Sequence, residues 1–470
     1  MGGNEYRYGK YKRLFRLGAK VWVMCYQAAV FWWIWLNFYN PRMDQPFALR
    51  GNWLILFVYI VVLWLFTNVY GGFQIGYEKP GSLSLSQSIS VTCANAAMIF
   101  VMVLLSREQI QMYGKLASLV PLGVVTAAQI AGIILSAFVL NQFYDNVFPP
   151  RKLLVVYGEY QNSACELIAK MSERHEKYII SEVINQKEGY ENILERIREY
   201  QGVVLMDVEN PLRNKILKYC YGAAIRVYVV PTISDIILTS AENIHFFDTP
   251  LLLARNSGLS IEQKLIKRIM DLTISGLGII ITSPVMLITA LAIKLYDGGP
   301  VFFRQDRATI GGSVFRITKF RSMVVDAEKN GISVPATQRD PRITPVGRFI
   351  RATRFDELPQ LFDIFRGNMS IVGPRPERVE HVEKYTEAIP EFCYRLKVKG
   401  GLTGYAQIYG KYNTTAYDKL KLDLMYIENY SILLDIKLML MTVKVIFMKE
   451  STEGFTEEKS AGMGKKREDG

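Results

Sequence analysis

The residues of this chain that most clearly suggest chemistry are two adjacent carboxylates, Asp356 and Glu357, in a segment rich in arginine. Carboxylates beside cations could hold Mg²⁺ together with substrate phosphates, or one of them could attack phosphorus as a nucleophile. The basic surroundings predict low pKa values for both groups, so that both stay ionised. Pro359 follows closely, as in the first turn of a helix, where the helix dipole favours a phosphate. On spacing alone, a solvated acidic pair that balances the arginines is the competing interpretation.

Basic residues flank this pair on both sides in the sequence. Arg348, Arg351 and Arg354 recur at every third position, which on a helix makes one basic stripe suited to bidentate contacts with phosphate oxygens. Lys319 and Arg321 alternate along a predicted strand, so both are expected on one face of it.

One further arginine is held between two prolines. Arg375 lies between Pro374 and Pro376, whose fixed φ angles restrict the backbone and could preorganise one guanidinium group. Taken alone, this short motif could equally be a rigid turn.

A long apolar stretch, Leu272–Leu291, precedes these motifs and is long enough to cross a bilayer. Ser283 and Pro284 lie near its centre, and a proline removes a backbone donor and kinks a helix. A full crossing would put the basic segment after it outside, against the positive-inside rule. We therefore expect a helix that enters the membrane, breaks at Ser283 and Pro284 and returns, with hydroxyls of Thr282 or Ser283 bonding the freed carbonyl groups. The competing interpretation is a fifth full span.

The first 150 residues contain four more apolar runs of roughly twenty residues, the length that spans hydrocarbon. These runs are Ala19–Phe38, Trp53–Tyr70, Ser88–Leu105 and Leu119–Phe143. Basic residues are concentrated before the first run and follow the fourth, which places the N-terminus inside and returns the chain to the inside after four crossings. A membrane anchor is the simplest role for these helices.

Short strands and helices alternate from Lys152 to about residue 250, which predicts a parallel, doubly wound sheet of the Rossmann-like type. The first turn of this segment, Gly158–Ser163, lacks the glycine spacing that lets a backbone approach a pyrophosphate. A structural or regulatory domain without a cofactor is therefore favoured over a nucleotide-binding one.

Length and composition agree with a membrane protein of several domains. Of the 470 residues, 50% are hydrophobic and 21% charged, which excludes a disordered chain, and the net charge of +12 favours anionic partners. Membrane and phosphate rank above nucleic acid, and no nucleic-acid partner is expected. We expect four regions: membrane helices in residues 1–150, the α/β domain in 151–250, a second α/β domain with the re-entrant helix in 251–450, and a disordered tail in 451–470.

The C-terminal motifs, taken in order, closely resemble those of the bacterial sugar transferases, the polyprenyl-phosphate phosphoglycosyl transferases that initiate polysaccharide assembly. The similarity runs from about Gln263 to Met448, and the layout with four spans and an α/β domain in front looks like the large members that start capsule or exopolysaccharide synthesis. The motifs are Lys267-Arg268, Asp271-Leu272, Ser283-Pro284, Asp297–Pro300, Lys319–Met323, Asp356–Gln360 and Gly373–Glu377.

The resemblance implies a reaction at the cytoplasmic face of the bacterial inner membrane. A UDP-sugar, expected to be UDP-glucose or UDP-galactose with an N-acetylated sugar still open, gives its sugar-1-phosphate to undecaprenyl phosphate and releases UMP. Asp356 would be the nucleophile that forms a covalent phosphosugar intermediate, and Glu357 would bind Mg²⁺ beside it. Arg375, Lys319 and Arg321 would lie near the donor phosphates.

Two other functions stay open on the sequence. The first is a catalytically inactive, membrane-anchored regulatory or scaffold protein of polysaccharide assembly, which the presence of Asp356, Glu357 and Arg375 disfavours. The second is a transporter, which is disfavoured because the four apolar runs contain no charged residue apart from Lys20 at the start of the first. A homodimer through the membrane helices or the middle domain is compatible with the sequence.

Overall fold

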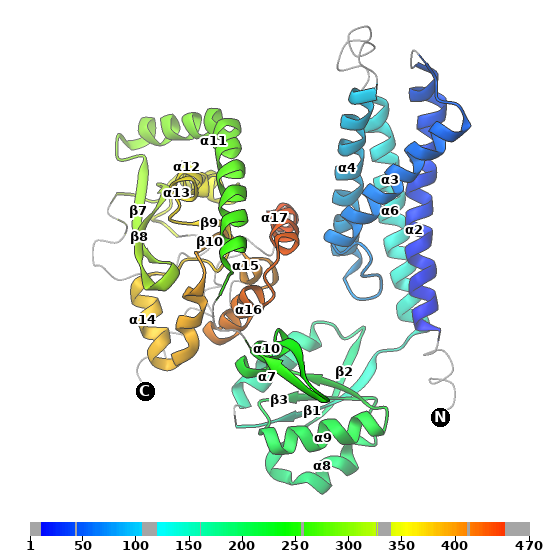
Figure 1. Ribbon diagram of the computed structural model, residues 1–470, viewed down its shortest axis with the longest axis vertical. Helices are drawn as coiled ribbons and strands as arrows, with labels where there is room; N and C mark the ends of the chain where they lie inside the picture. The colour runs from blue at the N-terminus through cyan, green and yellow to red at the C-terminus, as the bar shows by residue number, and fades with distance from the viewer. Residues whose placement is uncertain are drawn as a thin grey trace. The chain divides into compact units, whose positions relative to one another are not determined.

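The computed structural model describes residues 11–42, 45–105, 120–159, 161–254, 258–325, 327, 340–410 and 414–446 (Figure 1). The chain divides into two compact units, Met1–Pro231 and Thr232–Gly470, and each is described here by itself. The tail expected in residues 451–470 lies outside the described residues.

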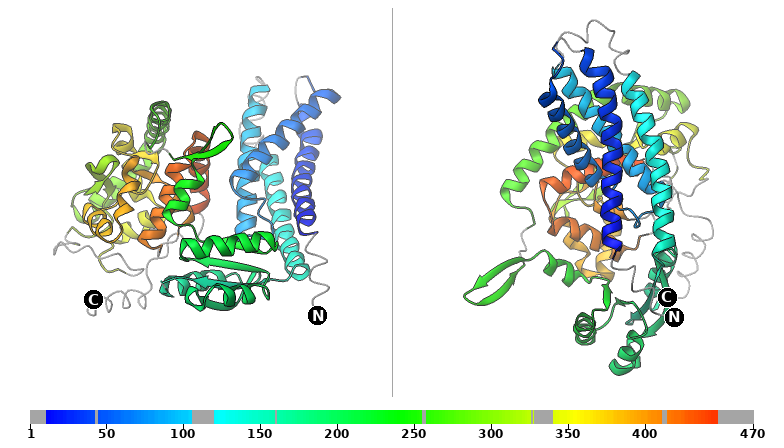
Figure 2. Two further views of the ribbon diagram at one scale, coloured as in Figure 1. Left: turned by 60° about the horizontal axis from the view of Figure 1, so that its bottom comes forward. Right: turned by 90° about the vertical axis from the view of Figure 1, so that its right-hand side faces the viewer.

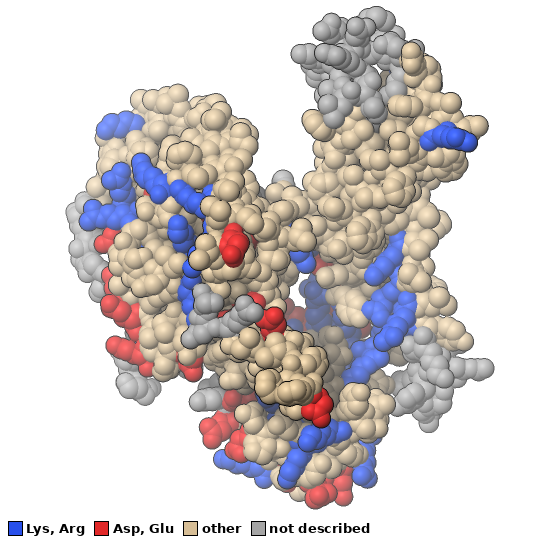
Figure 3. Space-filling view, in the orientation of Figure 1, with Lys and Arg blue, Asp and Glu red and all other residues tan. Residues whose placement is uncertain are grey.

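Four long helices open the first unit, and each of the four predicted apolar runs falls on one of them. They are α2 (Lys12–Ile34), α3 (Leu49–Val69), α4 (Pro80–Leu105) and α6 (Val120–Val147), and α2 continues through two short turns to Arg42. All four are long and apolar enough to cross a membrane. In Figure 3 the upper surface of this bundle is almost free of charged side chains, and Lys and Arg gather at its lower end.

The interior of the helix bundle contains a hydrogen-bonded polar cluster. The side-chain amide of Gln129 donates to the Tyr59 hydroxyl at 2.8 Å and to the Gln27 carbonyl at 2.9 Å, and it accepts from Asn95 at 2.8 Å. The Phe31 ring stacks on Tyr59 with ring centroids 3.8 Å apart. These contacts join α2, α3, α4 and α6, as polar side chains often do between helices that have no water to bond.

The second half of the first unit is a parallel four-stranded sheet in the order β2-β1-β3-β4, as the alternating pattern predicts. The elements are β1 (Arg151–Tyr157), α7 (Gln161–Ser172), β2 (Tyr178–Asn185), α8 (Tyr190–Ile197), β3 (Gly202–Met206), α9 (Asn210–Gly222) and β4 (Arg226–Val229). Strand β1 is central, and its run of four buried residues is typical of a strand covered on both faces.

The two faces of this sheet bury alternate residues of β1. Leu154 and Val156 lie in one cluster with residues of α8 and α9, whereas Leu153 and Val155 lie in another with residues of α7. At the end of β1, a Cβ atom on Gly158 would lie 1.7 Å from the Asp207 carbonyl oxygen. The close approach of two strand ends therefore requires this glycine.

The second unit begins at Thr232, so that α10 (Ile233–Thr239) belongs to it rather than to the α/β sheet before it. Ile233 and Ile236 of α10 are part of its main core, together with Phe392, Leu420 and Leu438. The hairpin of β5 (Glu242–Phe246) and β6 (Thr249–Leu253) follows and projects from the rest of the unit (Figure 2).

Helix α11 (Ile261–Asp297) follows, and other elements of the second unit pack against it. Two small sheets are present, an antiparallel pair of β7 (Phe302–Ala308) with β8 (Val314–Phe320) and a parallel pair of β9 (Ser370–Val372) with β10 (Gly401–Thr403). The helices are α12 (Pro345–Ala352), α13 (Gln360–Arg366), α14 (Val379–Ala388), α15 (Tyr405–Tyr409), α16 (Ala416–Glu428) and α17 (Ile432–Ile446), with a 3₁₀ segment at Pro390–Lys397.

Helix α11 is unusually long and apolar, and it changes direction along its length (Figure 1). Pro284 lies inside it and cannot donate to the Ile280 carbonyl, which is the ordinary cause of such a bend. The Ser283 hydroxyl donates to that same carbonyl at 2.8 Å, so the freed acceptor is bonded as expected. Ile280 and Ile281 are 71% and 73% exposed, which suits contact with lipid rather than with a protein core.

Candidate active site

The two carboxylates singled out in the sequence lie on a short 3₁₀ turn, Phe355–Glu357, between α12 and α13. The chain enters this turn through Arg354, whose φ of 60° is left-handed. The neighbours on either side of the pair, Phe355 and Leu358, pack into the cluster that contains Met286 of α11. Apolar flanking residues therefore fix the carboxylates beside the apolar helix.

Glu357 is the centre of a compact charge cluster. Its Oε1 atom accepts from Lys319 Nζ at 2.8 Å and from Arg375 Nη2 at 2.7 Å, and Arg354 Nη1 lies 3.9 Å from Oε2. Lys319 comes from β8, and Arg375 from the loop after β9. Burial alone would raise the pKa of Glu357, but Lys319 and Arg375 outweigh it and hold that pKa well below its usual range.

Asp356 has the opposite electrostatic balance. Burial and then the charge of Glu357 raise the pKa of Asp356, against the partial opposing effects of Lys319 and Arg351. The expectation that both carboxylates have low pKa values is therefore wrong for Asp356, because the cations pair with its neighbour instead. Its Oδ1 atom is buried and has no hydrogen-bond partner among the described residues.

Such a pair can divide two tasks between its members. Glu357 is committed to the cations, while Asp356 keeps an unpaired oxygen close to positive charge. A carboxylate of this kind can act as a nucleophile toward an electrophile whose negative charge Lys319 and Arg375 neutralise. Phosphate esters are electrophiles that carry such charge.

The backbone of Arg375 is held by a second ion cluster, whose central pair, Arg395 and Asp423, is buried. Arg395 donates from Nη2 to the Arg375 carbonyl at 2.9 Å and pairs with Asp423 at 2.7 Å. Glu377 lies 3.7 Å from Arg395 Nη1 and 2.7 Å from Lys419 Nζ. Burial would raise the pKa of Glu377, but Lys419 and Arg395 lower it to about 2. The sequence did not predict this cluster, because its members are far apart in the chain.

Comparison with known proteins bears directly on this site. The model of the family described as bacterial sugar transferase matches residues 262–449, a range that contains every contact of the charge cluster. A UDP-glucose:undecaprenyl-phosphate glucose-1-phosphate transferase of Caulobacter vibrioides is 41% identical over 183 residues, which are 38% of this chain and 68% of that protein. The chain belongs to the bacterial sugar transferase family.

Two longer relatives also match part of this family member. An enzyme of Escherichia coli with the same name as the Caulobacter protein is 44% identical over 202 residues, 42% of each chain. A UDP-N-acetylgalactosamine-undecaprenyl-phosphate N-acetylgalactosaminephosphotransferase of Aeromonas hydrophila is 38% identical over 235 residues, 49% of this chain and 55% of that protein. The similarity thus spans about half the length of these relatives.

The three arginines expected as one helical stripe do not form one in this sugar transferase. Helix α12 ends at Ala352, and Arg354 lies beyond it in a left-handed conformation. Arg348 is exposed, whereas Arg351 is partly buried and lies close enough to Asp356 to lower its pKa. The prediction of a single stripe is therefore wrong, because the turn that presents the carboxylates interrupts the helix.

Arg321 has partners of its own, apart from those of Lys319. It lies just after β8, where Nη1 donates to Asp297 Oδ2 at 2.8 Å, Nη2 donates to Asp297 Oδ1, and Nε donates to the Pro300 carbonyl at 2.7 Å. Gly299 leaves room for this guanidinium group, since a Cβ atom there would lie 2.9 Å from it. The observed role of Arg321 is to join the end of α11 to β8.

The carboxylates suit a magnesium ion that is shared with a substrate. Mg²⁺ is often bound by one or two carboxylates together with substrate phosphates rather than by a cage of protein ligands. No group of three or more His, Cys, Asp or Glu in the described part of the chain could hold a metal ion. The buried, unpartnered Oδ1 of Asp356 beside Glu357 fits the shared arrangement.

Proposed function

We propose that this chain transfers a sugar-1-phosphate from a UDP-sugar to undecaprenyl phosphate, the first step in the synthesis of a capsular or extracellular polysaccharide. The observation that carries the proposal is the pairing of Glu357 with Lys319 and Arg375, which leaves Asp356 with a free oxygen. The names of the three relatives supply the substrate classes.

In the proposed first step, Asp356 attacks the phosphorus that carries the sugar. A bond forms between its carboxylate oxygen and that phosphorus, and the bond to the bridging oxygen breaks, so that UMP leaves with the electron pair. In the second step, a phosphate oxygen of undecaprenyl phosphate attacks the same phosphorus and displaces Asp356. Covalent catalysis of this kind separates the water-soluble donor from the lipid acceptor.

The surrounding cations would bind and orient the donor. Lys319 and Arg375 are bonded to Glu357, the residue that follows Asp356. They would contact the phosphate oxygens of the donor. Arg351 and Arg354 lie close enough to Asp356 to stabilise its ionised form, while Arg348 and Arg321 would act at the edge of the site. Asp356 and Glu357 would hold Mg²⁺, which, when bound, neutralises charge on the pyrophosphate.

We also propose that α11 is re-entrant and that the two α/β domains lie on the cytoplasmic side of the inner membrane. The bend at Pro284, the bonded Ile280 carbonyl and the exposed apolar surface support re-entry. The basic residues at one end of the first four helices support the orientation. With Phe355 and Leu358 packed on α11, this topology would bring Asp356 to the membrane surface, where the lipid phosphate lies.

The four-region organisation stays part of the proposal: membrane helices, a Rossmann-like domain without a cofactor, the catalytic domain and a tail. The sugar is one of those in UDP-glucose, UDP-galactose or an N-acetylated donor, and the relatives act on both glucose and N-acetylgalactosamine by their names. A homodimer is compatible with this proposal.

The test is UMP release from a panel of UDP-sugars by the full chain in detergent, with undecaprenyl phosphate and Mg²⁺. We expect release with one donor, its loss on addition of EDTA, and a fall of at least about a thousandfold in Asp356→Asn. Asp306→Asn is the matched control, since Asp306 is an exposed carboxylate of β7 paired with Arg316. Full activity in Asp356→Asn would remove Asp356 as the nucleophile, and a folded protein silent with every donor would favour the inactive scaffold.

A further inference from the structure

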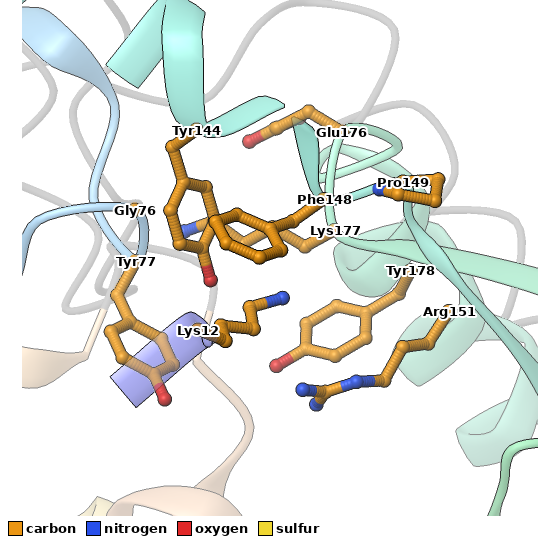
Figure 4. Close-up of a pocket in the computed structure, with 10 residues that line it drawn as sticks. All are labelled: Lys12, Gly76, Tyr77, Tyr144, Phe148, Pro149, Arg151, Glu176, Lys177 and Tyr178. Atoms are coloured by element: carbon orange, nitrogen blue, oxygen red, sulfur yellow. The ribbon is translucent and has the colours of Figure 1, made fainter. Parts of the chain in front are cut away.

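A pocket in the first unit lies where the membrane helices end and the α/β sheet begins (Figure 4). It is a shallow pocket, and the roughly 340 Å³ of space between its walls includes open solvent. Its walls come from four separate parts of the chain: the start of α2, the loop between α3 and α4, the end of α6 with the first residue of β1, and the start of β2. The side chains that matter below are Lys12, Tyr144, Phe148, Arg151, Lys177 and Tyr178.

Three cations line this pocket without a carboxylate partner. No ion pair joins Lys12, Arg151 or Lys177 to a carboxylate within the part of the chain that the structure describes. The Lys12 ammonium instead lies over the rings of Tyr144 at 4.8 Å and Phe148 at 5.5 Å, and Arg151 donates to a tyrosine hydroxyl. Cations withdrawn from water are normally paired, so this pocket has positive charge that is not neutralised.

The charges farther out do not cancel this excess. The Asp145 carboxylate lies near both Lys12 and Lys177, but three further cations offset it: Arg16 and Arg226 lie near Lys12, and Arg174 lies near Lys177. The one carboxylate that lines the pocket, Glu176, lies 3.9 Å from Arg174 and 4.0 Å from His175.

The surroundings of the pocket lower the pKa of Lys177. Burial first, and then Arg174, lower the pKa of Lys177 to about 8, although Glu176, Asp145 and Glu78 oppose the shift. An anion in the pocket would stabilise the charged form of this lysine.

We propose that this pocket binds a phosphate group, held by the ammonium groups of Lys12 and Lys177 and the guanidinium group of Arg151. Figure 4 shows the ends of Lys12 and Arg151 and the hydroxyls of Tyr144 and Tyr178 gathered around the same space, so the two tyrosines would be further donors. This site is separate from the transferase reaction and does not depend on it.

The phosphate has two chemical sources, which the same side chains would recognise. Because α2 begins and α6 ends at the pocket, the headgroup of an anionic membrane lipid is within reach. A water-soluble phosphate compound presents the same oxygens. Both would be held by charge-assisted hydrogen bonds.

The experiment measures the thermal unfolding midpoint of the full chain in a neutral detergent. One arm adds phosphatidylglycerol or, as its control, phosphatidylcholine to the micelles. The other adds inorganic phosphate or, as its control, chloride at the same ionic strength. We expect one of the two phosphate sources to raise the midpoint by about 3 °C more than its control. A shift with phosphatidylglycerol alone identifies a lipid headgroup, and a shift with inorganic phosphate identifies a soluble ligand.

Variants assign the shift to the pocket. Lys12→Gln/Lys177→Gln is expected to lose it, whereas Lys152→Gln, an exposed lysine beside Arg151, is expected to keep it. Retention of the full shift in the double variant, or no shift in the unaltered chain with either source, would overturn the proposal. If the double variant does not fold, native mass spectrometry of Lys177→Gln decides the same question. The measurement counts the phosphatidylglycerol or phosphate that this variant retains and compares it with the unaltered chain.

Discussion

Glu357 is the residue on which the charges of the active site converge, so its removal should cost stability as well as activity. Glu357→Gln removes the carboxylate that pairs directly with Lys319 and Arg375, which are both partly buried, and leaves only the more distant Asp356 near them. Because both cations keep some exposure, we expect a loss of about 2 kcal/mol rather than the full cost of a buried charge. The thermal midpoint of the C-terminal unit should fall by about 5 °C.

A second change separates charge from packing in that variant. The double variant Glu357→Gln/Lys319→Met also removes one of the two cations that paired with Glu357. Its thermal midpoint should be higher than that of Glu357→Gln, although it stays inactive. A midpoint equal to that of the unaltered chain in Glu357→Gln would show that the cluster does not stabilise the fold.

At the scale of residues, the sequence predicted those members of the candidate site that stand in short, recognisable motifs. Asp356, Glu357, Lys319 and Arg375 are each conspicuous in a short motif, and the structure brings all four together. The different environments of the two carboxylates could not be foreseen, because which of them receives the cations depends on how β8 and the loop after β9 meet the 3₁₀ turn.

The N-terminal half of α11 shows how an element can be fixed by single polar contacts of buried residues. The Asp271 carboxylate accepts from the Ser370 hydroxyl at 3.0 Å and from the Ile371 backbone N–H at 2.9 Å, which joins α11 to β9. Lys267, one turn earlier, pairs with Asp435 of α17 at 2.6 Å. These contacts fix the N-terminal half of α11, as the pairing of Arg321 with Asp297 fixes its C-terminal end.

Asp271→Ala should therefore loosen the whole element. It leaves two buried donors unsatisfied, at a cost of about 2 kcal/mol or more, whereas Asp271→Asn keeps an acceptor oxygen and should lose less than half of that. Thr273→Ala is the control, because its exposed hydroxyl bonds only to a carbonyl of its own helix. The measurement is the thermal midpoint, and equal losses in Ala and Asn would contradict the role of the hydrogen bonds.

At the scale of elements, the spacing of apolar residues was sufficient to predict a helix or strand wherever one physical requirement determined it. Uninterrupted apolar runs predicted the four long apolar helices, and short alternating segments predicted the parallel sheet. Helix α12 was expected to continue through Arg354, because a spacing of three residues does not reveal the left-handed backbone that ends it. That ending depends on tertiary packing of Phe355, which the local pattern does not contain.

At the scale of the whole molecule, two native cysteines report how often the chain crosses the membrane. Cys165 in α7 and Cys393 in the segment Pro390–Lys397 are both exposed, and they lie before and after α11 in the sequence. If α11 is re-entrant, both are cytoplasmic. If α11 crosses fully, they lie on opposite sides.

A membrane-impermeant maleimide distinguishes these topologies. In sealed inverted vesicles we expect both cysteines to be labelled, and in right-side-out vesicles neither, whereas Gln45→Cys, between α2 and α3, should show the reverse. Pro284→Ala restores a backbone donor to the Ile280 carbonyl and favours a straight helix, so it should move part of the Cys393 signal to the outside while Cys165 stays inside. Labelling of Cys393 from the outside in the unaltered chain would establish a fifth span and separate Asp356 and Glu357 from cytoplasmic UDP-sugars.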